Sequence, residues 1–122
     1  MTDTTRPKSL YERGSVVLVL FPHSDLRSAK PRPALVVQAN DLQTELSQVI
    51  GAMITSNIQR PNHPSRVFFK LSSQEGKQSG LLTDSVIMTD NLATIAENAL
   101  NRVIGFLSMT EVDKALRHTL NL

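Results

Sequence analysis

The sequence VVLVLFPHSDLRSAKPRPALVV, residues 16–37, decides the fold. Its first six residues are all aliphatic or aromatic, and such a short continuous run is typical of a strand buried on both faces. Pro22 ends the run, because proline has no N–H to donate to a strand ladder. A second, mainly apolar segment begins at Pro33 and is predicted as a strand to Ala39. The segment therefore predicts two strands joined by a polar loop over residues 22–32.

Three cations lie directly before the second predicted strand: Arg27, Lys30 and Arg32. A solvated loop is one interpretation, because most charged side chains only face water. A phosphate pocket is the other, because an arginine on a rigid edge can hold two phosphate oxygens at once. The residue pattern alone leaves both interpretations open.

The rest of the chain alternates short apolar runs with turn residues. Further strands are predicted at residues 49–55, with Gly51 as a possible bulge, and at residues 66–71, 84–89 and 103–107. Loops are predicted at residues 57–65 and 72–83, and a short helical turn at residues 98–102.

The C-terminus changes to helical spacing. Apolar residues on one face predict a helix over about residues 109–120, and Ser108 with Glu111 predicts a capping box at its start. Many short strands with one terminal helix indicate a mainly β fold with some α structure. The expected architecture is a small barrel or strongly curved sheet with the helix packed on it.

Length and composition bound the class of protein. A chain of 122 residues is most simply one domain, predicted here over residues 11–122 after a disordered leader at residues 1–10. Without cysteine the chain has neither disulfides nor thiolate metal sites, which fits a reducing cytoplasm. No apolar run approaches the roughly 18 residues of a membrane span. A net charge of +2 permits a polyanionic partner without requiring one.

Several kinds of site are disfavoured by the residues present. One tyrosine, four phenylalanines and no tryptophan argue against a broad aromatic platform for stacking bases. His23, His63 and His118 are too scattered for a metal-ligand pattern, so no metal and no cofactor is predicted. The sequence also has no Walker-type phosphate loop and no nucleophile elbow.

Short motifs in a particular order resemble the MazF/PemK family of toxin endoribonucleases. The matching pieces are Arg13-Gly14, Phe21-Pro22, RPALVV at residues 32–37, ITS at residues 54–56, DSVI at residues 84–87, Thr94-Ile95 and IGFLS at residues 104–108. The resemblance covers about residues 11–122, and it depends on the order and spacing of the pieces, since each is common by itself.

The resemblance implies a fold, an assembly and a reaction. The fold would be a small SH3-like β-barrel of the CcdB/PemK type with a C-terminal helix. The assembly would be a homodimer that binds single-stranded RNA across its interface, is inhibited by a small MazE/PemI-like antitoxin, and reaches operator DNA only through the antitoxin complex. The reaction would be metal-independent and sequence-specific cleavage of mRNA, leaving 2′,3′-cyclic phosphate and 5′-hydroxyl ends and thereby arresting translation and growth.

Arg32 and Thr55 match the two catalytic residues that the family motifs imply. The arginine of the RP pair would stabilise charge at the phosphorus, which is usually the largest single catalytic term. Thr55 in the ITS segment would donate to a phosphate oxygen without adding charge, and Ser56 would assist. From the residues alone, Arg32 can equally be a surface arginine at a strand start, and Thr55 an ordinary strand residue.

The general base and acid depart from the family pattern. Some members carry a histidine or glutamate several residues before the RP pair, where this chain has Leu26 and Arg27. His23 and Asp25 lie nearby but out of register, and an imidazole has a suitable pKa for a base. Asp90 matches an acid of the family's fifth strand, although it can also begin a turn.

Two polar loops supply the candidates for RNA binding. Cations would contact phosphates and position the strand, whereas amide and imidazole groups would meet unstacked bases. The candidates are Lys30, Asn57, Gln59, Arg60, His63 and Arg66. Two other functions stay open at this point: a CcdB-like toxin that binds DNA gyrase without catalysis, and a barrel that only binds nucleic acid or a partner protein.

Overall fold

The computed structural model describes residues 11–22, 29–40, 42 and 45–122, so the predicted leader at residues 1–10 lies outside the described residues. The described part forms one six-stranded sheet in which each observed strand pair is antiparallel. The elements in chain order are β1 (Ser15–Pro22), β2 (Ala29–Val36), β3 (Gln48–Thr55), β4 (Arg66–Phe69), α1 (Gln74–Ser79), β5 (Ser85–Ala96), the 3₁₀ turn η1 (Glu97–Ala99), β6 (Leu100–Phe106) and α2 (Thr110–Leu120).

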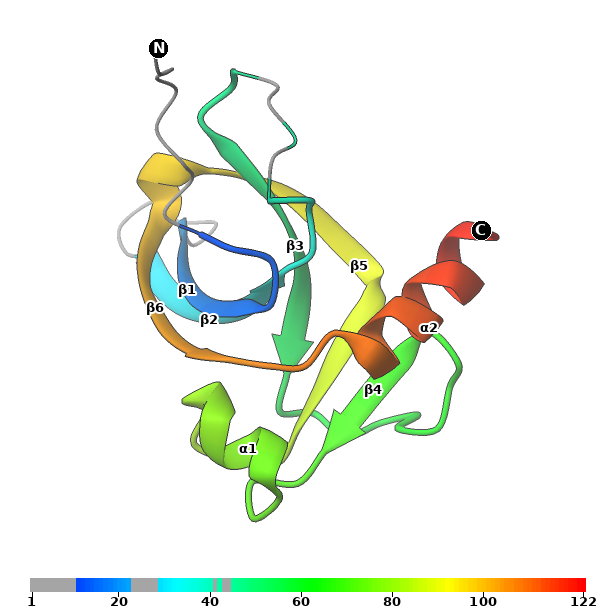
Figure 1. Ribbon diagram of the computed structural model, residues 1–122. Coiled ribbons are helices and arrows are strands. Elements are labelled where there is room, and N and C mark those ends of the chain that lie inside the picture. Colours follow the sequence, from blue (N-terminus) through cyan, green and yellow to red (C-terminus); the bar gives the residue numbers. More distant parts are fainter. Residues whose placement is uncertain (1–10, 23–28, 41, 43–44) are drawn as a thin grey trace, which may run out of the picture.

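The sheet coils strongly around its own axis. Its strand order is β4-β5-β3-β2-β1-β6, and Figure 1 shows β1, β2 and β6 curling back beside β3 and β5. In the described residues no pairing between the edge strands β4 and β6 closes the sheet. The mainly β fold with a curved sheet and a terminal helix is thus confirmed, with the sheet left open.

Both faces of the sheet are covered, and the alternation of side chains in β1 and β2 divides the core in two. Val16 pairs with Leu35 on one face, and Val17 pairs with Ala34 on the other. The first face packs with α2 through residues such as Val112, whereas the second face encloses its own cluster inside the curl. This double burial explains the continuous apolar run that begins at residue 16, and it confirms that β1 is buried on both faces.

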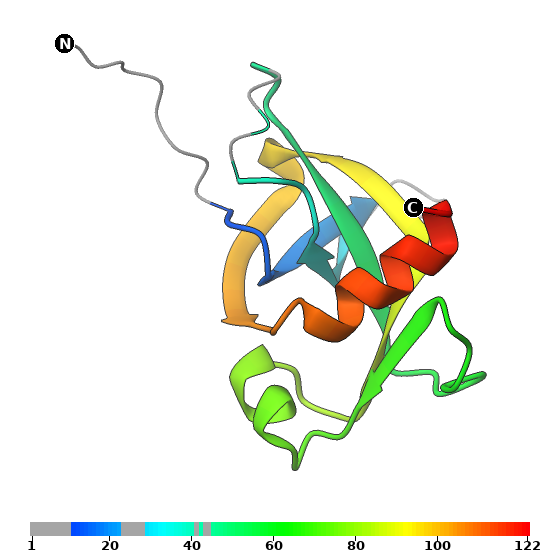
Figure 2. The ribbon, with the colours of Figure 1, turned by 45° about the vertical axis from the view of Figure 1, so that its right-hand side comes forward.

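Helix α2 lies across β4 and β5, as Figures 1 and 2 show, and it begins without the predicted capping box. Its N-cap is Met109, which makes no side-chain cap bond. The Glu111 carboxylate instead accepts from Lys114 Nζ at 3.3 Å. The capping-box prediction is therefore wrong, because the chain enters the helix one residue later than Ser108 and Glu111 turns to a neighbouring cation. No helix in the described part of the chain is both long enough and apolar enough to cross a membrane.

Arg13 ties the start of α2 to the sheet. Its Nε donates to Val37 O at 2.8 Å, and its Nη2 lies 2.6 Å from Asp113 Oδ1. The side chains of Arg13 and Asp113 are only 29% and 36% exposed, respectively. Solvent therefore screens this ion pair less than a fully exposed ion pair. Glu111, which is also in the first turn of α2, pairs with Lys114 while both are more than two thirds exposed.

These two pairs give a matched stability prediction. We expect Asp113→Ala to lower the free energy of unfolding by about 1 kcal/mol, because it leaves a half-buried guanidinium without its carboxylate. Glu111→Ala should change it by less than about 0.5 kcal/mol. Urea unfolding at low and high salt measures both, and equal effects of the two variants would contradict a special role for Arg13.

The segment predicted as a loop at residues 72–83 contains a helix, so that prediction is wrong over residues 74–79. Ser73 caps α1, because its Oγ accepts from Gly76 N at 3.0 Å, and Gly80 ends it in the left-handed conformation with φ +76°. Gly80 and Gly105 let the end of α1 lie directly on β6, as a Cβ on either residue would meet backbone within 2.3 Å. After α1 the chain continues into β5, as Figure 2 shows.

Strand β5 runs well beyond its predicted end at residue 89 and contains an irregularity. Its pairing with β3 changes from Ala52↔Leu92 to Met53↔Met88, so residues 89–91 bulge out of the ladder. The bulge predicted at Gly51 is wrong, because Gly51 pairs regularly with Ala93. A Cβ on Gly51 would lie 3.2 Å from Ile95 Cδ1, so the absence of a side chain at residue 51 leaves room for the Ile95 side chain.

Candidate active site

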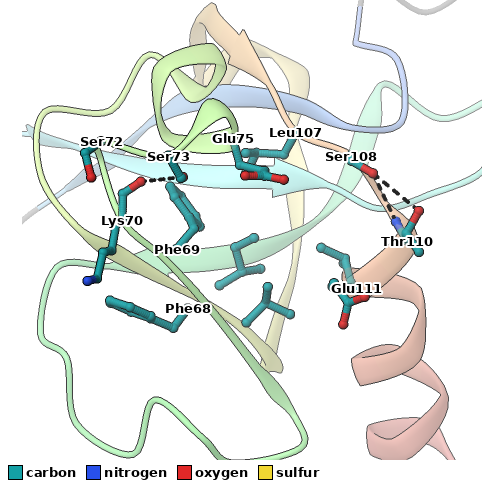
Figure 3. A pocket seen from close by; sticks show the side chains of 13 residues that line it. Phe68, Phe69, Lys70, Ser72, Ser73, Glu75, Leu107, Ser108, Thr110 and Glu111 are labelled. Carbon is teal, nitrogen blue, oxygen red and sulfur yellow. Dashed lines mark hydrogen bonds between the residues drawn. The ribbon is translucent and has the colours of Figure 1, made fainter.

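Two of the cavities on the described surface differ in the charges that line them. The first has a volume of about 550 Å³ and lies between β4, α1 and the start of α2. Figure 3 shows the rings of Phe68 and Phe69 in this cavity, with Lys70, Glu75 and Glu111 among its polar groups. Two carboxylates beside one ammonium disfavour a phosphate, so this cavity is not the candidate site for a nucleic acid.

The second cavity is a cleft of about 620 Å³ at the open end of the curl. It has one charged lining residue, Arg32, and no carboxylate. The lining consists of Pro31, Arg32, Pro33, Met53, Ile54, Thr55, Ser56, Leu81, Leu82, Thr83, Ser85, Met88, Asn91 and Ala93. An isolated guanidinium among apolar groups and hydroxyls can bind a phosphate with little competition from carboxylates.

Strand register brings Arg32 and Thr55 to the same cleft. β2 and β3 pair as Ala34↔Met53, Leu35↔Ala52 and Val36↔Gly51. The same register continued for two residues sets Arg32 opposite Thr55, and side chains two apart on a strand share a face. Arg32 and Thr55 therefore lie on the face of Ala34, at the open end of the inner core.

The guanidinium of Arg32 is exposed and has no ion-pair or hydrogen-bond partner among the described residues. Two other arginines are engaged in ion pairs, Arg13 with Asp113 and Arg66 with Asp90. Pro31 and Pro33 flank Arg32 and restrict the backbone on both sides. This arrangement keeps the charge available to a ligand and limits the movement of its base.

The hydroxyl of Thr55 is half-buried, and its oxygen already accepts one hydrogen bond. Its Oγ1 accepts a hydrogen bond from Asn57 N at 3.0 Å, which orients the group at the end of β3. In the described residues nothing accepts the hydroxyl hydrogen, so it can be donated to an anion in the cleft. Ser56 follows on the exposed rim of the same cleft.

The other predicted residues of β4 and β5 lie outside the cleft lining. Asp90 Oδ2 is 3.3 Å from Arg66 Nη2, so the predicted acid and one predicted RNA-binding cation form an ion pair with each other. His63 Nδ1 accepts from Ser65 N at 3.1 Å, and its ring stands edge-on to His118 with the centroids 6.2 Å apart. These contacts turn His63 toward the end of α2.

The remaining predicted residues are exposed loop residues, one residue of β2 and two residues outside the described part of the chain. Asn57, Gln59 and Arg60 are exposed in the segment that follows β3, and Arg60 has a positive φ of 56°. His23 and Asp25 lie outside the described residues, and Lys30 lies in β2 without a described side chain. Among the side chains that the structure describes, no group of three His, Asp or Glu could hold a metal ion.

One wall of the cleft was not predicted from the sequence. It is formed by Leu81, Leu82 and Thr83 after α1, and by Asn91 in the bulge of β5. Leu82 is 91% exposed, so its side chain is open to a ligand in the cleft. The pair Leu81-Leu82 beside Gly80 was the available signal, but its place beside Arg32 depends on the docking of α1.

The chain is similar to known proteins over most of its length. The family model described as PemK-like, MazF-like toxin of type II toxin–antitoxin system matches residues 12–120. Endoribonuclease MazF6 of Mycobacterium tuberculosis is 34% identical over 107 residues, covering 84% of this chain and 90% of the relative. Endoribonuclease EndoA of Bacillus subtilis is 33% identical over 118 residues, covering 93% and 97%.

A solved structure supports the same fold. It is described as an endoribonuclease in complex with its cognate antitoxin from Mycobacterial species, and it superposes with a TM-score of 0.69 at 21% identity over 91% of this chain and 95% of that chain. The family model spans nearly the whole chain, and the two relatives named endoribonucleases are each about one third identical to it. The chain therefore belongs to the PemK-like, MazF-like toxins of type II toxin–antitoxin systems.

Proposed function

We propose that this toxin is an endoribonuclease that cleaves single-stranded RNA in the cleft of Arg32 and Thr55. The observation that carries the proposal is the shared cleft itself. The Arg32 guanidinium and the Thr55 hydroxyl hydrogen line one cavity, and neither has a partner among the described residues, nor is a carboxylate present in the described lining. The family and the names of the relatives agree with this activity.

The proposed reaction uses the RNA's own 2′-oxygen as nucleophile. This oxygen loses its proton and bonds to the adjacent phosphorus, while the bond from phosphorus to the 5′-oxygen breaks and that oxygen takes up a proton. The products are a 2′,3′-cyclic phosphate and a 5′-hydroxyl. No external water attacks in this step, so a metal-activated water is not required, and the EDTA experiment below tests this metal independence.

Arg32 would stabilise the negative charge that builds on the phosphoryl oxygens, and Thr55 would donate to one of these oxygens. Because the Thr55 oxygen already accepts a hydrogen bond from Asn57 N, the hydroxyl loses little rotational freedom when the substrate binds. Ser56 would support the same phosphate from the rim. His23 and Asp25 remain the proposed candidates for proton transfer, because no described lining residue carries an imidazole or carboxylate.

Asp90 is a weaker proposal for proton transfer, because its carboxylate is paired with Arg66 and lies outside the cleft lining. The RNA beyond the scissile phosphate would be guided by Lys30, Asn57, Gln59 and Arg60. His63 and Arg66 would contact the RNA only if the RNA strand extends toward β4. We further propose a homodimer, inhibition by a small antitoxin, contact with operator DNA only through that complex, and a cytoplasmic site of action in which mRNA cleavage arrests growth.

The product ends test the reaction. Purified protein incubated with single-stranded RNA in EDTA is expected to give fragments with 2′,3′-cyclic phosphate and 5′-hydroxyl ends. The 5′ ends should accept phosphate from polynucleotide kinase without prior dephosphorylation. RNA that stays intact at high protein concentration would contradict the nuclease and favour a toxin that acts by binding, and cleavage that EDTA abolishes would contradict the metal-independent mechanism.

A further inference from the structure

Asn91 is placed in the cleft by the bulge of β5. Residues 89–91 stand opposite a single backbone step of β3, from Ala52 to Met53. In a regular ladder each of these residues would have a partner on β3, and their side chains would alternate between the faces. The bulge instead sends Thr89 to the interior, Asp90 to Arg66 and Asn91 to the lining of the cleft.

Buried hydroxyl groups hold this bulge in one conformation. Thr89 is fully buried, and its N–H and Oγ1 both donate to Ser65 O, at 3.0 Å and 2.6 Å. Thr89 Oγ1 also lies 2.7 Å from Thr119 Oγ1, which is itself 2.7 Å from Ser65 Oγ. The start of β4, the bulge and the last turn of α2 are thereby joined, so Asn91 stands on a backbone that is fixed from behind.

The Asn91 side chain itself is exposed and makes no hydrogen bond to another described residue. Its neighbours in the lining include Met53, Met88 and Ala93, which offer an apolar surface but no competing polar group. A flat apolar ligand with hydrogen-bonding edges suits this arrangement, because its faces can lie against the thioethers while one edge meets the amide.

We propose that Asn91 reads the edge of an RNA base next to the phosphate held by Arg32, and so contributes to the choice of cleavage sequence. This inference rests on the proposed nuclease function, which supplies the single-stranded RNA. Bases of single-stranded RNA are unstacked and can present their edges to a protein. A carboxamide offers one donor and one acceptor side by side, a pattern that pairs especially well with adenine.

The test compares cleavage profiles of the wild type, Asn91→Ala and Asn101→Ala. Asn101 is an exposed asparagine on β6 outside the cleft lining, so its variant makes the same chemical change elsewhere. On an RNA library, Asn91→Ala should lower cleavage at the preferred sites about 10- to 100-fold while weaker sites change little, so that the preference flattens. Asn101→Ala should keep the wild-type profile.

A uniform fall at all sites, or an unchanged profile, would overturn the proposal. If the wild type cleaves no RNA, the nuclease proposal fails by itself, and binding of short RNAs that differ in one base then decides about Asn91. In that case the wild type should discriminate between the bases, Asn91→Ala should not, and equal discrimination by both proteins would refute a base-reading role.

A second variant tests whether the bulge positions Asn91. Thr89→Val keeps the branched shape but removes the hydroxyl, so the link to Ser65 and Thr119 is weakened. We expect a flattened cleavage preference with unchanged product ends, and restoration of the preference in Thr89→Ser. A preference that stays intact in folded Thr89→Val protein, as checked by circular dichroism, would show that the hydroxyl cluster does not position Asn91.

Discussion

Replacing Arg32 with alanine is expected to lower RNA cleavage by about 100- to 1000-fold, because one preorganised donor to a developing oxyanion is worth that much. Arg32 is the only charged residue among the described lining of the cleft, so no other described lining residue can take over its role. The side chain is exposed and lies outside both hydrophobic clusters, so the free energy of unfolding should change by less than about 0.5 kcal/mol.

Four further variants make this result specific. Arg32→Lys should recover only part of the rate, because an ammonium keeps the charge but cannot contact two phosphate oxygens in a planar fork. Arg117→Ala removes an exposed arginine of α2 and should leave the rate unchanged. Thr55→Val should lower the cleavage rate less than Arg32→Ala does. In the double variant the two fold-losses in rate should not simply multiply if both groups act on one phosphate. Single-turnover cleavage of a labelled RNA measures all of them, and full activity of Arg32→Ala would refute the assigned site.

The shared cleft of Arg32 and Thr55 was within reach of the sequence because it depends on strand periodicity. Arg32 is two residues before Ala34, and Thr55 is two residues after Met53, so alternation places both pairs on the same faces of their strands. The predicted start of the second strand at Pro33 is wrong, because β2 begins at Ala29 and Arg32 pairs with Val19 inside the strand. What the spacing did not give was the register between the two strands, which depends on the whole sheet.

The α1 segment could not be predicted by the same means. Its sequence QEGKQS has no apolar residue to give a helical period, and its glycine offsets the favourable helix propensity of Gln, Glu and Lys. The helix forms because the end of α1 packs directly against the backbone of β6, and such tertiary contacts outweigh weak local preferences. The wall of the cleft that follows α1 was missed for the same reason.

The bulge of β5 was missed because its cause lies far away in the sequence. Thr89 is held by Ser65, 24 residues earlier, and by Thr119, 30 residues later. The sequence DSVIMTDNLATIA reads as one strand followed by a turn at Asp90-Asn91, and no local feature shows that the strand resumes. The site residue that depends on this bulge, Asn91, could therefore be found only after the fold was known.

Gly105→Ala is expected to lower the free energy of unfolding by about 3 kcal/mol, the upper end of the range typical of overpacking, because the groups that the new Cβ would meet cannot move aside. An added Cβ at residue 105 would lie 2.3 Å from both Gln78 O and Ser79 C. These are backbone atoms at the end of α1, so no side-chain rotation can relieve the clash. Gly105 is also paired with Val16, which prevents β6 from moving away without breaking the ladder.

Gly51→Ala is the matched control, since Gly51 is also a strand glycine without positive φ. Its added Cβ would meet the tip of the Ile95 side chain at 3.2 Å and Leu35 O at 3.4 Å, and the flexible tip can shift. We expect a change of less than about 1 kcal/mol, because the entropy lost by the unfolded chain offsets the tight contact. Urea unfolding of the two variants measures the difference directly.

Gly105→Ala should also reduce RNA cleavage, although Gly105 does not line the cleft. Displacing the end of α1 moves Leu81, Leu82 and Thr83, which follow it directly and form one wall beside Arg32. Cleavage measured at a temperature where the variant is still folded should therefore fall, whereas Gly51→Ala should cleave normally. If Gly105→Ala unfolds at the same urea concentration as the wild type, α1 is not docked on β6, and the position of this wall would need another cause.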